Sequence, residues 1–144
     1  MKGMTVIVKK VTQLLCGIIF IFGIYIVLHG HLTPGGGFAG GTIIAGAFIL
    51  LVLAYGDHII HLRVRKEDSS RLESFAIFLF LAFALAGMFM IPSVFFSNYY
   101  PLGAVGELLS AGVIPLYNIF IGVEVAAALF TVFLAFVILK EEDK

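Results

Sequence analysis

The chain has 144 residues, a formal net charge of zero, 61% hydrophobic side chains and only 12% charged ones, with a mean hydropathy of +1.12. A water-soluble domain has about 45–50% apolar and about 25% charged residues. This composition therefore excludes a soluble globular protein. The balanced charge also gives no support to a nucleic-acid-binding surface.

Four apolar stretches without acidic or basic interruption, apart from one glutamate in the last, follow one another along the chain. They cover residues 11–28, 38–56, 75–96 and 116–139. A helix needs roughly 17–25 residues to cross a hydrocarbon core about 30 Å thick. We therefore expect an all-α integral membrane protein with four transmembrane helices, forming one domain over residues 1–144. The polar segments between the stretches are too short to build a hydrophobic core of their own.

The nine basic residues predict how the chain is oriented. All of them lie before the first apolar stretch, between the second and third, or after the fourth, whereas residues 29–37 and 97–115 have none. Basic residues near membrane helices are retained on the cytoplasmic side. Both termini and the middle loop are therefore expected in the cytoplasm. No small-residue cleavage site follows the first stretch, so we expect it to remain as a membrane helix.

A glycine-rich segment joins the first two predicted helices. Thr33 and Pro34 are suited to a helix start, because threonine caps free amides and proline fits the first helical position. The glycines that follow form a stripe of small residues spaced four apart. The motif consists of Pro34, Gly35, Gly36, Gly37, Gly40 and Gly41. We interpret it as a helix-packing motif, along which another helix approaches closely; the alternative is an unwound segment that offers backbone groups to an ion or water.

Glu124 is the one acidic or basic residue inside the four apolar stretches. A charged group at this depth is costly unless it faces protein or water. Tyr117 and Thr131 lie seven residues to either side, so the three share one face of the fourth helix. An acid here suits proton carriage or sodium coordination. The alternative is a structural hydrogen bond or ion pair to a neighbouring subunit.

A motif at the junction of the first two helices carries a family resemblance. It reads Gly30-His31-x-x-Pro34-Gly35-Gly36-Gly37-Phe38-x-Gly40-Gly41. This run resembles the signature of the MrpB/MnhB-like family, one of the subunit families of Mrp-type (Mnh) multisubunit sodium/proton antiporters, and the chain is similar to that family in length and topology. The resemblance implies a non-enzymatic subunit in a prokaryotic plasma membrane, with other antiporter subunits as partners and Na⁺ and H⁺ as transported ions. It also adds His31 to the candidate ion path, because a histidine side chain can relay protons.

The host complex stays open at this point. Residues 115–123 look closer to subunits in the antiporter modules of membrane-bound hydrogenases and sulfur-reducing relatives, where redox chemistry would belong to partner subunits. A third hypothesis is a purely structural subunit without ion contacts. We expect no catalytic, cofactor or metal site in this chain. Its polar segments are too short to form an enzyme domain of their own, and its single cysteine, Cys16, has no metal-ligand spacing around it.

Overall fold

A computed structural model describes residues 4–56, 59–91 and 94–142, and for residues 59–64 and 141–142 it describes the backbone alone. The described chain folds into four helices: α1 (Val6–Leu28), α2 (Gly36–Tyr55), α3 (Ile59–Met90) and α4 (Ile114–Glu142). Each contains a stretch long and apolar enough to cross a membrane. The expectation of an all-α protein with four candidate membrane helices is confirmed.

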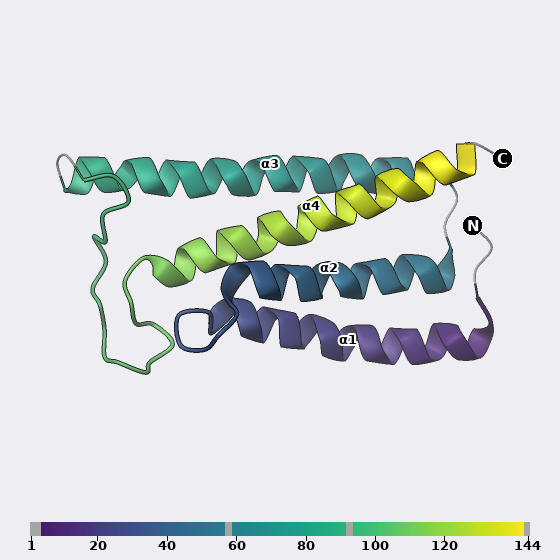
Figure 1. Cartoon of the computed structure of the whole chain (residues 1–144), viewed down its shortest axis with the longest axis horizontal. Coiled ribbons are helices and arrows are strands. Elements are labelled where there is room, and N and C mark those ends of the chain that lie inside the picture. The colour runs from purple at the N-terminus through teal and green to yellow at the C-terminus, as the bar shows by residue number, and fades with distance from the viewer. Residues whose placement is uncertain (1–3, 57–58, 92–93, 143–144) are drawn as a thin grey trace.

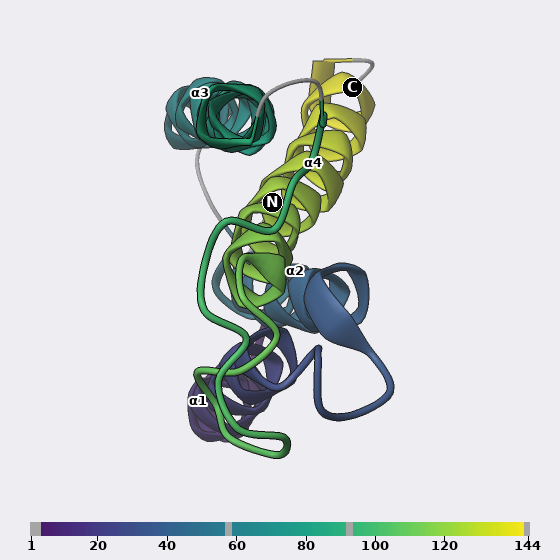
Figure 2. The ribbon, with the colours of Figure 1, turned by 90° about the vertical axis from the view of Figure 1, so that its left-hand side faces the viewer.

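The helices lie in a row in the order α1, α2, α4, α3, which the end-on view in Figure 2 shows. α2 packs between α1 and α4, and α4 packs between α2 and α3. Within the described residues, α3 contacts neither α1 nor α2. α4 is therefore the helix through which α3 is attached to the remainder of the chain.

The two ends of the molecule, along the length of the helices, differ. α1 begins and α4 ends at the same end of the molecule, which we call the terminal end (Figure 1). At the opposite end, the loop end, α3 extends beyond α1 and α2, and the chain from 94 to 113 folds back to reach α4 (Figure 1). The row is thus stepped, with the last turns of α3 beside this loop.

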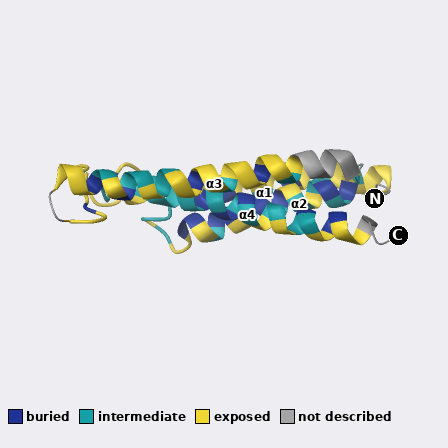
Figure 3. Cartoon of the chain, turned by 90° about the horizontal axis from the view of Figure 1, so that it is seen from above, coloured by how far each residue is buried: buried dark blue, intermediate teal, exposed yellow. Residues whose placement is uncertain are grey.

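Burial follows the position of each helix in the row. The buried share of the apolar window is 39% in α2 and 33% in α4, but 17% in both α1 and α3. Figure 3 shows exposed residues along much of α3 and buried ones gathered where α2 and α4 lie. Near the terminal end, Val52 of α2 packs in one cluster with Leu134 and Val137 of α4. The central pair therefore forms the core, and the outer helices present apolar surface.

Two buried hydrogen bonds join neighbouring helices. The Cys16 thiol of α1 donates to the Ala47 carbonyl of α2 at 3.2 Å. The Ser69 hydroxyl of α3 donates to the Ala127 carbonyl of α4 at 2.9 Å. Each satisfies a polar side chain that would otherwise be buried at a cost.

The third helix differs from its predicted bounds of 75–96. It begins at Ile59 and ends at Met90, so residues 59–74, expected as a polar loop, are helical. The sequence has no glycine or proline from 57 to 86, and an ion pair one turn apart, Arg71 with Asp68 at 3.7 Å, lies on the exposed surface. Polarity therefore did not mark a helix boundary. The charged residues continue the helix.

The second helix also starts later than Thr33 and Pro34. Its first residue is Gly36, preceded by Gly35 with φ of 141°. The Thr33 hydroxyl instead donates to the His29 carbonyl at 3.1 Å, and the Thr33 backbone N–H donates to the same oxygen at 2.9 Å. Thr33 therefore satisfies a carbonyl at the end of α1. Gly35 adopts a backbone conformation that favours glycine.

Candidate functional site

Gly40 of α2 lies against α1. A Cβ atom added at Gly40 would stand 2.8 Å from the Gly23 carbonyl oxygen and would also collide with Val27. Gly23 is equally tight, since a Cβ there would lie 2.7 Å from Ile44. The two backbones therefore touch because neither helix has a side chain at the crossing.

Gly37 and Gly41, on a neighbouring face of α2, lie against α4. A Cβ at Gly41 would stand 2.6 Å from the Gly122 carbonyl oxygen and 2.9 Å from Val125 Cβ. One at Gly37 would collide with the Asn118 carbonyl and lie 2.8 Å from Ile121 Cβ. The glycine motif is therefore divided between two partner helices of the same chain.

Asn118 is the polar residue at this junction, and the sequence reasoning did not single it out. Its Oδ1 atom accepts a hydrogen bond from the Gly37 backbone N–H at 3.4 Å. Its Nδ2 atom is buried without a partner among the described residues. Cβ atoms added at Gly30 or Gly36 would meet the same side chain, at 2.8 Å and 3.3 Å. The sequence feature that could have indicated this role is the single amide side chain of Asn118 near the start of an apolar helix.

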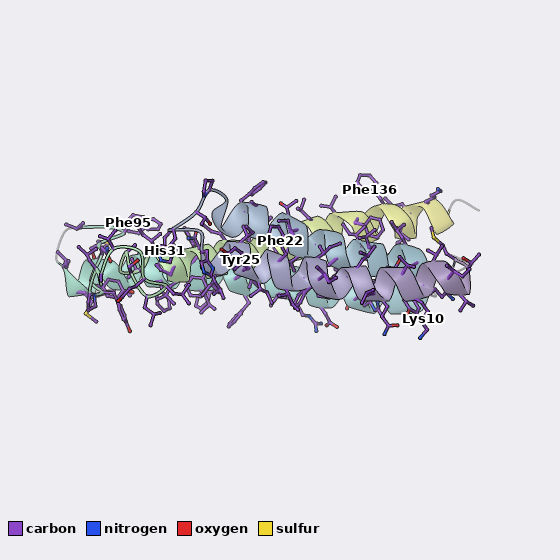
Figure 4. The ribbon with its side chains drawn as sticks, turned by 90° about the horizontal axis from the view of Figure 1, so that it is seen from below. Lys10, Phe22, Tyr25, His31, Phe95 and Phe136 are labelled. Carbon is purple, nitrogen blue, oxygen red and sulfur yellow. The ribbon has the colours of Figure 1, made fainter. Side chains whose placement is uncertain are left out.

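His31 lies at the loop end, in the connection between α1 and α2 (Figure 4). Its Nε2 atom is 3.3 Å from the Glu107 carbonyl oxygen, while Nδ1 is buried without a described partner. The ring therefore joins the α1–α2 connection to the long loop before α4. Nothing in the described contacts brings it to the row of polar residues on α4.

That row faces α3. The Tyr117 ring lies 5.1 Å from the Phe80 ring of α3 and 5.3 Å from the Phe96 ring of the loop. Seven-residue spacing carries the same face through Glu124 to Thr131. Pro34, by contrast, is exposed and lies in the connection between α1 and α2.

The polar atoms of Tyr117, Glu124 and Thr131 lack hydrogen-bond partners among the described residues. The hydroxyl oxygens of Tyr117 and Thr131 are buried, and neither has a hydrogen-bond partner among the described residues. Glu124 is half-buried between them, and no described residue forms a hydrogen bond or ion pair with it. It is ten residues, or about 15 Å, into α4. Polar atoms left in this way at membrane depth call for water, an ion or a neighbouring subunit.

Comparison with known proteins identifies the family. Residues 7–131 match the profile described as "Domain related to MnhB subunit of Na+/H+ antiporter". The protein MJ1307 of Methanocaldococcus jannaschii is 37% identical over 133 residues, covering 88% of this chain and 50% of that protein. A Staphylococcus epidermidis chain named as antiporter subunit mnhB2 is 47% identical over 55 residues, 38% of this chain and 39% of its own length.

A solved structure is also similar. It is a chain in the structure of the membrane-bound sulfane sulfur reductase (MBS), described as an archaeal respiratory membrane complex, with a TM-score of 0.62 and 28% sequence identity. The match covers 89% of this chain and 56% of that one. The chain thus spans about half the length of the first relatives it matches. By its sequence profile and by its four apolar helices, this chain belongs to the family of membrane domains related to the MnhB subunit of Na⁺/H⁺ antiporters.

Proposed function

We propose that this chain is a non-enzymatic subunit of a multisubunit sodium/proton antiporter in a prokaryotic plasma membrane, with both termini cytoplasmic. Helix α4 contributes to the proton or cation path through Glu124. One observation carries the second part: Glu124 is a half-buried carboxylate within the membrane span of α4, flanked by two buried hydroxyls that have no described partner. An acid in a membrane span can exchange a proton for a cation.

The experiment uses the complete antiporter, assembled with its partner subunits in membrane vesicles, and measures sodium-driven proton movement. Glu124→Gln keeps the size of the side chain but cannot release a proton, so exchange should fall while assembly is retained. Glu124→Asp should keep part of the exchange. Glu107→Gln is the matched control, because that side chain is exposed in the loop and its carbonyl alone contacts His31.

The outcomes separate an ion-path role from a structural one. A structural role predicts that Glu124→Gln exchanges at the wild-type rate and that Glu124→Ala weakens assembly, because alanine also removes the polar side chain. Wild-type exchange by assembled Glu124→Gln complexes at every pH would remove Glu124 from the path.

A second host complex is supported by the similarity to the sulfane sulfur reductase structure. There the same subunit would serve an antiporter module joined to redox subunits, and this chain would carry no redox centre. Purification from the native membrane with a tag on this chain distinguishes the two hosts. Co-purification of iron-sulfur or nickel-iron proteins indicates the redox-linked complex, and antiporter subunits alone indicate the stand-alone one.

A further inference from the structure

The seam between α3 and α4 has a defined register. The Ser69 hydroxyl bonds the Ala127 carbonyl, and the Phe80 ring, eleven residues later on α3, lies 5.1 Å from the ring of Tyr117, ten residues earlier on α4. The helices therefore run antiparallel, with rising numbers on α3 opposite falling numbers on α4.

This register places a second acid level with Glu124. Glu73 lies four residues from Ser69 toward the loop end, and Glu124 lies three residues from Ala127 in the same direction. Residues three or four apart share a helix face. Both carboxylates therefore lie one turn beyond the Ser69–Ala127 hydrogen bond on the facing sides of the two helices.

The surroundings of Glu73 resemble those of Glu124. Glu73 is also half-buried, and it has no hydrogen bond or ion pair with any residue that the structure describes. Its neighbour on the same face, Ala76, is only 2% exposed, so this face of α3 is covered by α4. The polar residues along the seam continue toward the terminal end with half-buried Lys66, seven residues from Glu73, and with the buried Thr131 hydroxyl.

The titratable groups on the facing sides can be named. They are Lys66 and Glu73 on α3, and Tyr117 and Glu124 on α4. The opposite side of α4 packs on α2, whose sequence has no acidic, basic or histidine residue. α4 also contacts α1, with Val27 beside Gly122. The acidic and basic side chains named above lie in the α3–α4 seam.

We propose that Glu73 is the second acid of the path, and that protons reach or leave Glu124 through it along the α3–α4 seam. No hydrogen bond joins the two carboxyl groups in the structure, so one water molecule would carry the proton. The O–H bond of protonated Glu73 breaks as the water accepts its proton, a water proton bonds to ionised Glu124, and the negative charge passes to Glu73. The hydroxyls of Tyr117 and Thr131, for which the described part of the chain offers no partner, mark the same seam as polar on both sides of the pair. This inference rests on the proposed ion-path role of Glu124.

The placement is tested without transport. In a Cys16→Ser background, the Glu73→Cys/Glu124→Cys pair in the assembled complex should form an oxidant-induced disulfide, because facing Cα atoms on packed helices come within bonding range. The Glu67→Cys/Glu124→Cys pair is the matched control, since Glu67 is exposed on another face of α3. Equal linking of the two pairs, or linking of neither, would overturn the placement.

The role is tested by exchange in assembled complexes. Glu73→Gln should slow sodium-driven proton movement by about tenfold or more, Glu73→Asp should restore part of it, and Glu67→Gln should leave it unchanged. Residues that act in series are non-additive, so the double variant Glu73→Gln/Glu124→Gln should be no slower than the slower single variant.

The results also distinguish failure of this inference from failure of the proposed function. Wild-type exchange in Glu73→Gln with loss in Glu124→Gln overturns the role of Glu73 and leaves that of Glu124. Wild-type exchange in both overturns both. Multiplying losses in the double variant would show two independent effects and would also overturn the relay.

Discussion

The side chain of Asn118 on α4 caps another helix: its Oδ1 atom accepts the Gly37 N–H of α2 at 3.4 Å. α2 begins with glycines and has no side-chain cap of its own. The first N–H groups of a helix lack intrahelical partners, so a cap from outside satisfies one of them. The start of α2 thus depends on a residue 81 positions away in sequence.

Asn118→Ala should destabilise the assembled protein by about 1 kcal/mol, because one capping hydrogen bond is lost. Thermal unfolding of the purified complex in detergent measures the change. Thr42→Ala is the control, since its hydroxyl is exposed and bonds the Phe38 carbonyl of the same helix. Equal losses in the two variants would contradict the capping role.

Gly41→Ala should cost about 1–3 kcal/mol, because the added methyl meets the Gly122 carbonyl and forces α2 away from α4. Gly46→Ala is the matched control on the same helix, where an added Cβ meets nothing within 4 Å. It should be neutral or stabilising by up to about 1 kcal/mol, because alanine favours the helix. Unfolding midpoints that fall equally in both variants would contradict this packing.

The side of the membrane on which each end lies can be tested by labelling. In a Cys16→Ser background, Tyr100→Cys in the loop should react with an impermeant maleimide added outside intact cells, and Lys140→Cys near the end of α4 should not. Both residues are exposed in the structure. Permeabilised cells provide the control, where both should react. Reaction of Lys140→Cys alone from outside would reverse the proposed orientation.

His31→Phe should loosen the loop before α4, because phenylalanine fills the space but has no group to bond the Glu107 carbonyl. Hydrogen exchange at residues 102–113 should become faster in the assembled complex. His29→Phe is the control, because the His29 ring nitrogen bonds the Tyr25 carbonyl within its own segment. Unchanged exchange in His31→Phe would show that other contacts hold the loop.

The sequence predicts the four helices well because apolar stretches of this length have few alternatives in a membrane. It predicts the α3 boundary poorly because charged residues such as Arg71 and Asp68 are good or tolerable helix formers, and polarity marks the membrane edge rather than the helix end. Spacing placed Gly37 and Gly41 on one face, but it could not reveal that Gly40 serves a different helix. Asn118 and Glu73 were missed because their importance depends on which helices are neighbours.

The row of helices has a consequence for synthesis. α3 is made before α4, yet α4 is the one helix that α3 contacts within the described residues. α1 and α2, in contrast, are consecutive in the chain and contact each other directly, so they can pack together once both have been translated. During synthesis the chain would therefore contain an α1–α2 hairpin and an α3 helix without its partner. This state would last until α4 has been made and packs between α2 and α3.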